Sequence, residues 1–528
     1  MGTQLSFNSG QLSEMMKYRV DTDKRTMGAE ELENVIVDQE GMAFKRPGTE
    51  FIDTEIAEYG IQIIVTPEVL GDYPTLRTTT DQADPGLTHT LAISNVTELQ
   101  AMNDNKTGNY YLTGNIDASA TSTWNAGAGF VPIGQSGVAS GFKGTFDGCG
   151  YTISDLYINR NSNGQALFGW VYPEAKIANV TMANIDISGG SSYVGALVGF
   201  MLQSDVGDIL IQNCHSSGTI APSGGGVMGY YGGLIGYAAR QSGHSAGTAY
   251  IYDCSSTCTL DMSTATSGSY RGGFVGWLIQ TTVSNCFATG SLTGGDGGDE
   301  QIGGFVGATF QSSYSFCYAT GSVEGAFEQC GGFVGDVGAD TSFNSCSATG
   351  NSSGAVGGTA VGGFAGSVVS AGDAITFADC YAWGDAVSGG TVSGGFVGSS
   401  PTNNTTYDNC YSIGIPSGTA ELGGIAGAMH ASTKATNIYW DTETSGLATT
   451  DENVGTGHTT TWMKTKSNLT DAGWDMDTIW YQAYTAIVYG DLGGGGGNVR
   501  LIPFEFRTND AYVIEMGHEC LSFFRTTQ

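Results

Sequence analysis

The chain has 528 residues, of which 40% are hydrophobic, 13% are charged and 83 are glycine, and its formal net charge is −32. The hydrophobic share is enough for a large core, and glycines without a three-residue period beside only ten prolines exclude a collagen-like chain. No Lys or Arg lies between Gly272 and Thr433, which excludes nucleic-acid binding through phosphates there, and no apolar run reaches the 18 residues that suggest a membrane-spanning helix.

Residues 1–56 do not repeat and contain both acidic and basic side chains. Within them, "AEELENVIV" is compatible with either a short helix or a strand. The start, "MGTQLSFNSGQLSEMM", lacks the basic and apolar parts of a secretory signal, so we expect no export by that route. Residues 57–87 are predicted to be a linker.

A short strand-like unit recurs through residues 88–447, as in "GALVGF", "GGLIGY", "GGFVGW" and "GGFVGD". After a first copy that ends at Gly169, the closing glycines are Gly199, Gly236, Gly276, Gly307, Gly335, Gly366, Gly398 and Gly427. Their spacing of 28 to 40 residues predicts stacked structural units and not separate globules. Glycine is poorly tolerated in helices, whereas short β-branched and aromatic runs between turn residues favour strands.

A second series consists of single cysteines, at Cys214, Cys254, Cys286, Cys317, Cys346, Cys380 and Cys410. In stacked coils each of these would lie on its image in the next coil, as a small apolar residue in a narrow interior. The rival interpretation is a metal or redox ladder, but metal sites prefer paired ligands such as C-x2-C. We therefore predict buried, reduced thiols and no metal or cofactor.

Together these features predict an all-β fold, a parallel and right-handed β-solenoid with three strands per coil. Glycines would recur where its wall bends sharply. Residues 448–490 are predicted to cap the solenoid, and residues 491–497, "DLGGGGG", are predicted to form a flexible linker.

Residues 498–528 contain two strand-like stretches, "VRLIPFEF" and "AYVIEMG", which are too short to be stable alone. They need a partner subunit or the N-terminal segment. The expected organisation is therefore a solenoid inserted into a small, discontinuous, β-rich platform made by both ends of the chain.

The central repeats resemble the GLUG-type repeats of bacterial and phage surface proteins. The resemblance includes "ISNVTELQAMN" at Ile93, "FVPIGQSG" at Phe130 and the exit sequence "NIYWDTETSG" at Asn437. It implies an extended, non-catalytic stalk or binding surface.

The two ends resemble a widespread phage tail protein family that opens with a Gly-Glu-Leu-Ser-Pro-like start. The matching stretches include an Arg-Pro-Gly turn at Arg46, Pro47 and Gly48, and "RLIPFEF" with Pro503 and Phe504, while Gln11 and Glu14 depart from the usual residues. The resemblance implies a virion protein assembled in the bacterial cytoplasm, in contact with copies of itself and with neighbouring tail or portal-adaptor proteins.

The first functional hypothesis is therefore a structural tail protein whose projecting solenoid decorates the particle or binds host glycan or surface protein, with no membrane or nucleic-acid partner for the solenoid. A polysaccharide depolymerase is the alternative, because Glu324, Glu328 and Asp336 could supply paired carboxylates. Sugar-stacking candidates are Trp277, Tyr318, Tyr381 and Trp383. A bacterial surface adhesin is a third possibility, and a weak calcium site in the acidic turn near Asp296 is left open.

Overall fold

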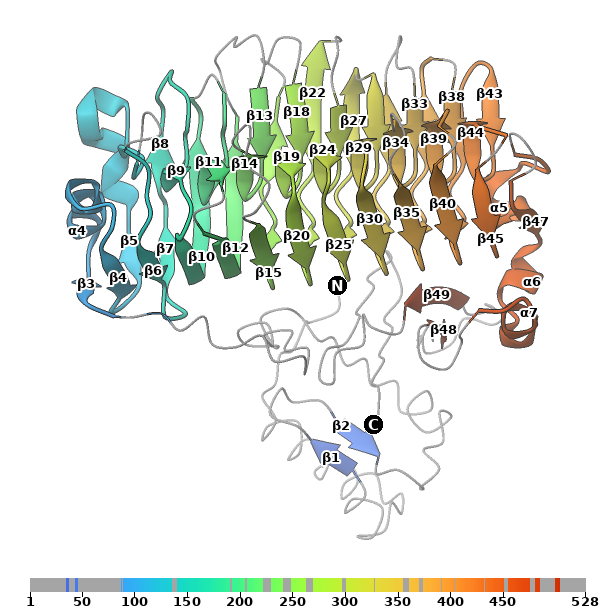
Figure 1. Ribbon diagram of the computed structural model, residues 1–528, viewed down its shortest axis with the longest axis horizontal. Helices are drawn as coiled ribbons and strands as arrows, with labels where there is room; N and C mark the ends of the chain where they lie inside the picture. The colour runs from blue at the N-terminus through green and yellow to red at the C-terminus, as the bar shows by residue number, and fades with distance from the viewer. Residues whose placement is uncertain are drawn as a thin grey trace, which may run out of the picture. The chain divides into compact units, whose positions relative to one another are not determined.

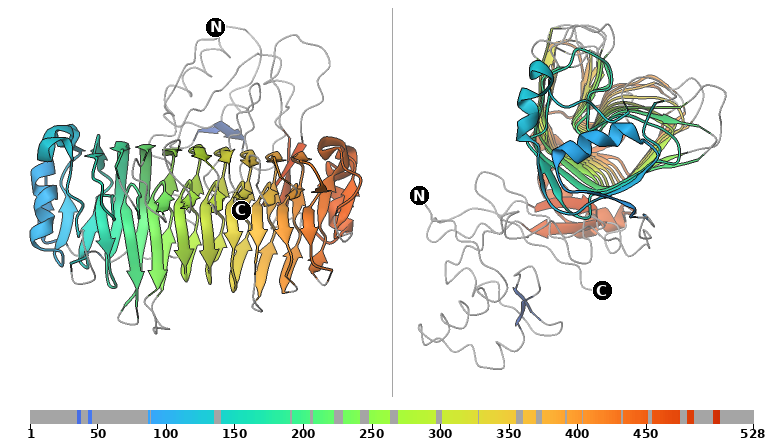
Figure 2. Two further views of the ribbon diagram at one scale, coloured as in Figure 1. Left: turned by 90° about the horizontal axis from the view of Figure 1, so that it is seen from above. Right: turned by 90° about the vertical axis from the view of Figure 1, so that its left-hand side faces the viewer.

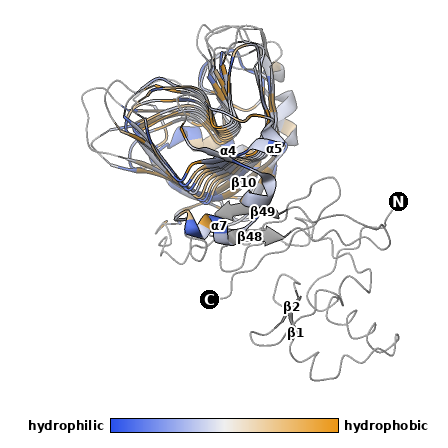
Figure 3. Ribbon diagram, turned by 90° about the vertical axis from the view of Figure 1, so that its right-hand side faces the viewer, coloured by the Kyte–Doolittle hydropathy of each residue, from blue (hydrophilic) through white to orange (hydrophobic). Residues whose placement is uncertain are grey.

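The computed structural model describes residues 35–37, 43–45, 87, 89–134, 140–189, 192–204, 207–221, 229–240, 248–262, 269–296, 301–326, 328–354, 360–369, 374–390, 392–402, 404–431, 433–450, 454–474, 480–484 and 499–503. The chain divides into two units, one of Ala83–Asp475 and one of Met1–Gln82 with Met476–Gln528. The larger unit is a stack of parallel coils (Figure 1), so the predicted β-solenoid is confirmed. Seen along the stack, the successive coils overlay one another (Figures 2 and 3).

From residue 229 to residue 429 each coil contributes to three sheets, in agreement with the three strands expected, whereas the earlier coils have no strand in the seven-stranded sheet. The nine-stranded sheet consists of β9 (Phe168–Val171), β11 (Val198–Gln203), β14 (Ile235–Arg240), β19 (Val275–Ile279), β24 (Val306–Phe310), β29 (Val334–Val337), β34 (Ala365–Val368), β39 (Val397–Ser400) and β44 (Ala426–Met429). The seven-stranded sheet consists of β13 (Gly229–Gly232), β18 (Ser269–Gly272), β23 (Gln301–Gly303), β28 (Gln329–Gly331), β33 (Ala360–Gly362), β38 (Val392–Gly394) and β43 (Glu421–Gly423).

The third, broad sheet has three columns, and two long strands, β10 (Lys176–Ile187) and β12 (Ile209–Ile220), run through all of them. The first column also holds β3 (Leu91–Ile93), β4 (Asn109–Leu112), β6 (Thr145–Asp147), β15 (Ala249–Tyr252), β20 (Thr281–Ser284), β25 (Ser313–Ser315), β30 (Thr341–Asn344), β35 (Ile375–Ala378), β40 (Thr405–Asp408) and β45 (Lys434–Thr436). The second holds β5 (Ile116–Asp117), β7 (Thr152–Ser154), β16 (Ser255–Ser256), β21 (Phe287–Ala288), β26 (Tyr318–Ala319), β31 (Ser347–Ala348), β36 (Tyr381–Ala382), β41 (Tyr411–Ser412), β46 (Tyr439–Asp441) and β47 (Thr456–His458). The third holds β8 (Tyr157–Ile158), β17 (Thr259–Asp261), β22 (Leu292–Asp296), β27 (Val323–Ala326), β32 (Ser352–Gly354), β37 (Ala386–Ser388) and β42 (Pro416–Ser417).

The broad sheet bends between its first and second columns at one left-handed residue per coil. These corner residues have φ between 49° and 56° and are Asn179, Asn213, Asp253, Asn285, Phe316, Ser345, Asp379, Asn409 and Asn437. Asn and Asp tolerate this conformation better than other non-glycine residues. Their side chains also link successive coils: Asn437 Nδ2 donates to Asn409 Oδ1 over 3.0 Å, and Asn409 Nδ2 donates to Asp379 Oδ1 over 3.1 Å.

Two rows of aromatic rings fill the core. Phe274, Phe305, Phe333, Phe364 and Phe396 stack along the axis with ring centroids 4.6 to 4.9 Å apart. Tyr314, Phe343, Phe377 and Tyr407 form a second row with spacings of 4.9 Å, and the two rows meet edge to face at 84° to 90°. The ring spacing matches the distance between neighbouring strands, so each ring gains contact with its image in the next coil.

Short helices lie at the two ends of the stack (Figure 1). At the first end, α4 (Val96–Ala101) is capped by Asn95, which accepts from the Glu98 N–H, and is followed by the 3-10 helices η1 (Met102–Asp104) and η2 (Ser119–Gly127). At the other end are α5 (Thr442–Ser445), α6 (Thr460–Met463) and α7 (Lys466–Asp471). The buried Trp474 ring lies 5.8 Å from that of Tyr439 in the last coils.

In the smaller unit the structure describes two antiparallel pairs. β1 (Val35–Val37) pairs with β2 (Ala43–Lys45), so the end of "AEELENVIV" is a strand. β48 (Trp480–Tyr484) pairs with β49 (Val499–Pro503). The platform residues Arg46, Pro47, Gly48 and Phe504 lie outside the described residues, and the joint platform stays a prediction. No helix in the described part of the chain is both long and apolar enough to cross a membrane.

Candidate functional site

The closing glycines form one column, each at the second position of a strand in the nine-stranded sheet. Their backbone lies against the seven-stranded sheet of the preceding coil. A Cβ on Gly276 would be 2.7 Å from the Tyr231 nitrogen, and one on Gly335 would be 2.4 Å from the Ile302 nitrogen. Glycine therefore recurs because two backbones meet here with no room for a side chain.

The seven predicted cysteines form a column at the corner of the broad sheet. All are fully buried, and the ten cysteines that the structure describes are free thiols. Each S–H faces a carbonyl two residues back, as in Cys254 to Tyr252 at 3.0 Å and Cys286 to Ser284 at 3.2 Å. Burial raises the pKa of Cys286 well above its ordinary value, so this thiol stays protonated at neutral pH. These properties suit packing and not nucleophilic chemistry.

A different column carries seven aromatic rings, most of them partly exposed, which we call the outer aromatic ladder. It consists of Trp170, Phe200, Tyr237 and Trp277 on the nine-stranded sheet, with Tyr193, Tyr230 and Tyr270 opposite them. Tyr230 and Tyr237 stack with centroids 4.4 Å apart and planes at 12°. Tyr270 and Trp277 repeat this pairing one coil later, at 4.5 Å and 24°.

The ladder is continuous along the axis as well as across it. Tyr230 stacks on Tyr270 at 5.2 Å and 6°, and Tyr237 stacks on Trp277 at 5.4 Å and 26°. Burial is the main cause that raises the pKa of Tyr237 to about 12 and that of Tyr193 above its ordinary range. These phenols are consequently neutral at physiological pH and can donate hydrogen bonds from the edge of an aromatic surface.

Beyond Trp277 and Tyr270 the two columns change from rings to smaller side chains. The next positions are Ala308 and Gln301, and the positions after those are Asp336 and Gln329. The Oδ1 atom of Asp336 and the Oε1 atom of Gln329 are buried without a hydrogen-bond partner in the structure. Burial raises the pKa of Asp336 to about 6. Two coils beyond the last rings, the two columns thus contain two buried acceptor atoms without a partner.

The other predicted aromatic residues lie on the broad sheet. Tyr318 stacks on Phe287 at 5.0 Å, and Trp383 donates its indole N–H to the Tyr411 hydroxyl over 2.7 Å. Tyr381 also stacks on Tyr411, at 5.4 Å. Trp277 is therefore the one sugar-stacking candidate that belongs to the outer aromatic ladder.

The predicted carboxylates are dispersed over different elements. Glu324 lies in β27 of the broad sheet, Glu328 precedes β28, and Asp336 lies in β29. The axial neighbours of Asp336 are Ala308 and Ser367, neither of which is an acid. Stacking of the coils therefore does not place a second carboxylate directly above or below Asp336, as a pair for glycoside hydrolysis along this column would require.

Sequence reasoning missed most of the ladder. The signal was present in four units whose closing glycine is followed by an aromatic residue, in "FGW", "VGF", "IGY" and "VGW". The facing tyrosines come just before the Gly-Gly corner or its equivalent, and only the folded corner brings them opposite those rings.

No protein-family model matches the chain. A segment of 116 residues, 20% of the chain, is 39% identical to halomucin of Haloquadratum walsbyi, and it spans 1% of the length of that protein. Two solved structures are similar in fold: one assigned as an immunoglobulin A1 protease from Bacteroides ovatus (TM-score 0.33, 17% identity, 74% of this chain and 88% of that one), and an IgA1 protease (TM-score 0.30, 15% identity, 66% of this chain and 21% of that one). At these TM-scores neither structure assigns an activity to this chain.

Proposed function

We propose that the chain is a structural surface protein whose solenoid is displayed outward and binds carbohydrate through the outer aromatic ladder. The observation that carries this proposal is the row of seven aromatic rings on the outside of the coil, most of them partly exposed. Rings buried only for packing are found in the core rows, where Phe274 and Phe333 are fully inaccessible. Partly exposed aromatic rings beside neutral phenols provide both the apolar and the polar contacts that a sugar requires.

The proposed setting is a bacteriophage tail, with the two chain ends as the anchor. This part is supported by the terminal motifs at Arg46–Gly48 and Pro503–Phe504, and the local similarity to halomucin supports display at a surface. Labelling of intact particles with an antibody against the solenoid tests it: decoration of the tail is expected, whereas signal confined to the bacterial envelope would favour the adhesin.

The binding proposal is tested by retention of the full-length protein in gels that contain host capsular polysaccharide. Trp277→Ala should reduce retention about 2- to 30-fold, because stacking surfaces of this kind contribute roughly 0.5–2 kcal/mol. Tyr318→Ala, which removes a partly exposed ring of the broad sheet, is the matched control and should bind normally. Equal retention of both variants, at unchanged far-UV circular dichroism, would refute the role of the ladder.

A depolymerase is the second candidate, and the raised pKa of Asp336 is the observation that favours it. A carboxyl group with a pKa of about 6 could act as a general acid in glycoside hydrolysis. Release of reducing ends from the polysaccharide, abolished in Asp336→Asn, would establish the enzyme. Binding without release of reducing ends would support the scaffold.

A further inference from the structure

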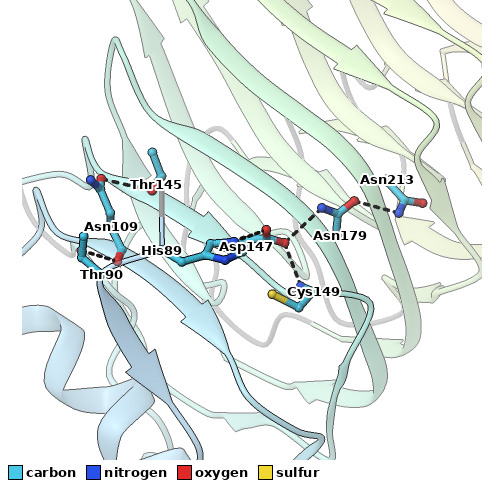
Figure 4. A network of polar contacts seen from close by, with 8 residues as sticks. All are labelled: His89, Thr90, Asn109, Thr145, Asp147, Cys149, Asn179 and Asn213. Carbon is cyan, nitrogen blue, oxygen red and sulfur yellow. Dashed lines mark hydrogen bonds and ion pairs between the residues drawn. The ribbon is translucent and has the colours of Figure 1, made fainter. Parts of the chain in front are cut away.

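Three metal-ligating side chains meet in the first coils of the solenoid. Among the residues that the structure describes, His89, Asp147 and Cys149 form a group whose ligand atoms all lie within 4.8 Å of one another (Figure 4). His89 lies just before β3, Asp147 ends β6, and Cys149 is in the turn that follows β6. The group combines a nitrogen, an oxygen and a sulfur ligand.

The carboxylate of Asp147 is held at one oxygen and presents the other. Its Oδ1 atom accepts from the Cys149 backbone N–H over 2.8 Å and from Asn179 Nδ2 over 3.0 Å. Asn179 is itself fixed, because its Oδ1 accepts from Asn213 Nδ2 over 3.0 Å. The Oδ2 atom points to His89 Nε2, 2.6 Å away.

The imidazole is oriented but accessible. It stacks on Tyr111 with centroids 4.8 Å apart and planes at 20°, and Tyr111 is the cross-strand partner of Asp147. The His89 side chain is 42% exposed, and Cys149 is also exposed. Outer contacts of this kind are what orient histidine and carboxylate ligands in metal sites.

The order of the three groups disfavours a nucleophilic cysteine. A Cys–His pair requires the imidazole next to the thiol, with the acid behind the imidazole. Here hydrogen bonds join Asp147 to the imidazole on one side and to the Cys149 backbone on the other. The imidazole nitrogen that faces the site, His89 Nε2, is bound to Asp147 and not to the Cys149 thiol.

We propose that His89, Asp147 and Cys149 bind one zinc-type transition-metal ion, with water in the fourth position. Thiolate and imidazole ligands select zinc or cobalt over calcium and magnesium, and a three-ligand site open to solvent leaves one position for water. Bonds of about 2.0–2.1 Å to nitrogen and oxygen place the two atoms roughly 3.3 Å apart in a tetrahedron. His89 Nε2 and Asp147 Oδ2 therefore separate slightly around the ion, while the Cys149 sulfur moves closer.

Binding exchanges a proton for the ion. The Cys149 S–H bond breaks as the sulfur–metal bond forms, and the proton passes to solvent. The ion would then tie His89, just before β3, to Asp147 at the end of β6, 58 positions later in the chain, and to Cys149 in the turn that follows. Metal should consequently raise the thermal stability of the folded chain.

Cobalt substitution tests the proposal on the full-length chain. In a Cys520→Ser background, which removes the one cysteine outside the described residues, Co²⁺ should bind in a 1:1 ratio with a sulfur-to-cobalt charge-transfer band. One equivalent of Zn²⁺ should abolish the band, and excess Mg²⁺ or Ca²⁺ should not.

Variants then assign the ligands. Cys149→Ser should eliminate the charge-transfer band, His89→Ala should weaken binding at least about 100-fold, and the positioning variant Asn179→Ala should weaken it about tenfold. Cys258→Ser, at a buried thiol elsewhere, is the control and should retain the band. Absence of a stoichiometric band in the parent protein, or its persistence in Cys149→Ser, would overturn the proposal.

Discussion

Replacement of Gly335 by alanine tests whether close contact between two sheets explains the repeated glycine. An ideal Cβ at this position would lie 2.4 Å from the Ile302 nitrogen, 2.5 Å from the Gly307 oxygen and 2.8 Å from the Gln301 carbonyl carbon. All three are backbone atoms, so none can rotate away. An ordinary contact begins near 3.4 Å, and 3.4 − 2.4 requires a shift of 1.0 Å in one of the two strands.

That shift is costly because β29 is held on both sides. Val334 pairs with Val306 in the preceding coil and with Ala365 in the next. Overpacking of a well-filled site usually costs about 1–3 kcal/mol, whereas the loss of glycine's freedom in the unfolded chain returns about 0.4–1 kcal/mol. We therefore expect Gly335→Ala to lower the free energy of unfolding by about 1–2 kcal/mol.

Urea unfolding followed by tryptophan fluorescence measures the effect, with the transition midpoint as the readout because a stack of coils need not unfold in a single step. Gly114→Ala is the matched control. A Cβ on Gly114 would have no neighbour within 4 Å, so this variant should be neutral or slightly stabilised. Equal midpoints for Gly335→Ala and the parent protein would refute the close-contact explanation.

Two further predictions concern buried groups. Burial raises the pKa of Asp336 from 3.8 to about 6, so between these values the folded state holds a proton that the unfolded state has lost. The free energy of unfolding should therefore fall by about 1–3 kcal/mol as the pH rises from 4 to 8. In urea unfolding at a series of pH values, Asp336→Asn should remove most of this pH dependence, and an unchanged dependence would contradict the assignment. In the Cys520→Ser protein, a thiol reagent should modify Cys149 at once and the nine buried thiols only after unfolding, so more than one rapidly reacting thiol per chain would show that the cysteine column is accessible.

The repetitive part of the fold could be predicted because stacking places equivalent residues on one another. The spacing of the closing glycines and of the single cysteines is enough to align the coils, and the register Val306–Val334–Ala365 follows that alignment. The choice between helix and strand for "AEELENVIV" could not be made, because a short apolar run has no decisive period. Its end is the strand Val35–Val37.

The candidate sites depend on contacts that repetition does not encode. Tyr230 and Tyr237 are in the same coil but on two sheets, and they face each other only because the chain turns at Gly232 and Gly233. His89 and Asp147 precede the first closing glycine and share no ligand spacing, so their 2.6 Å contact could be found only from the fold.

Because each coil pairs only with its two neighbours along the axis, the number of coils sets the length of the solenoid. One more copy of the roughly thirty-residue repeat would lengthen the solenoid by about 4.8 Å and would leave the other pairings between neighbouring coils unchanged. Tandem duplication or deletion within the gene could thus adjust the reach of the rod in small steps, while the helices at its two extremities keep closing it off from end-to-end polymerisation.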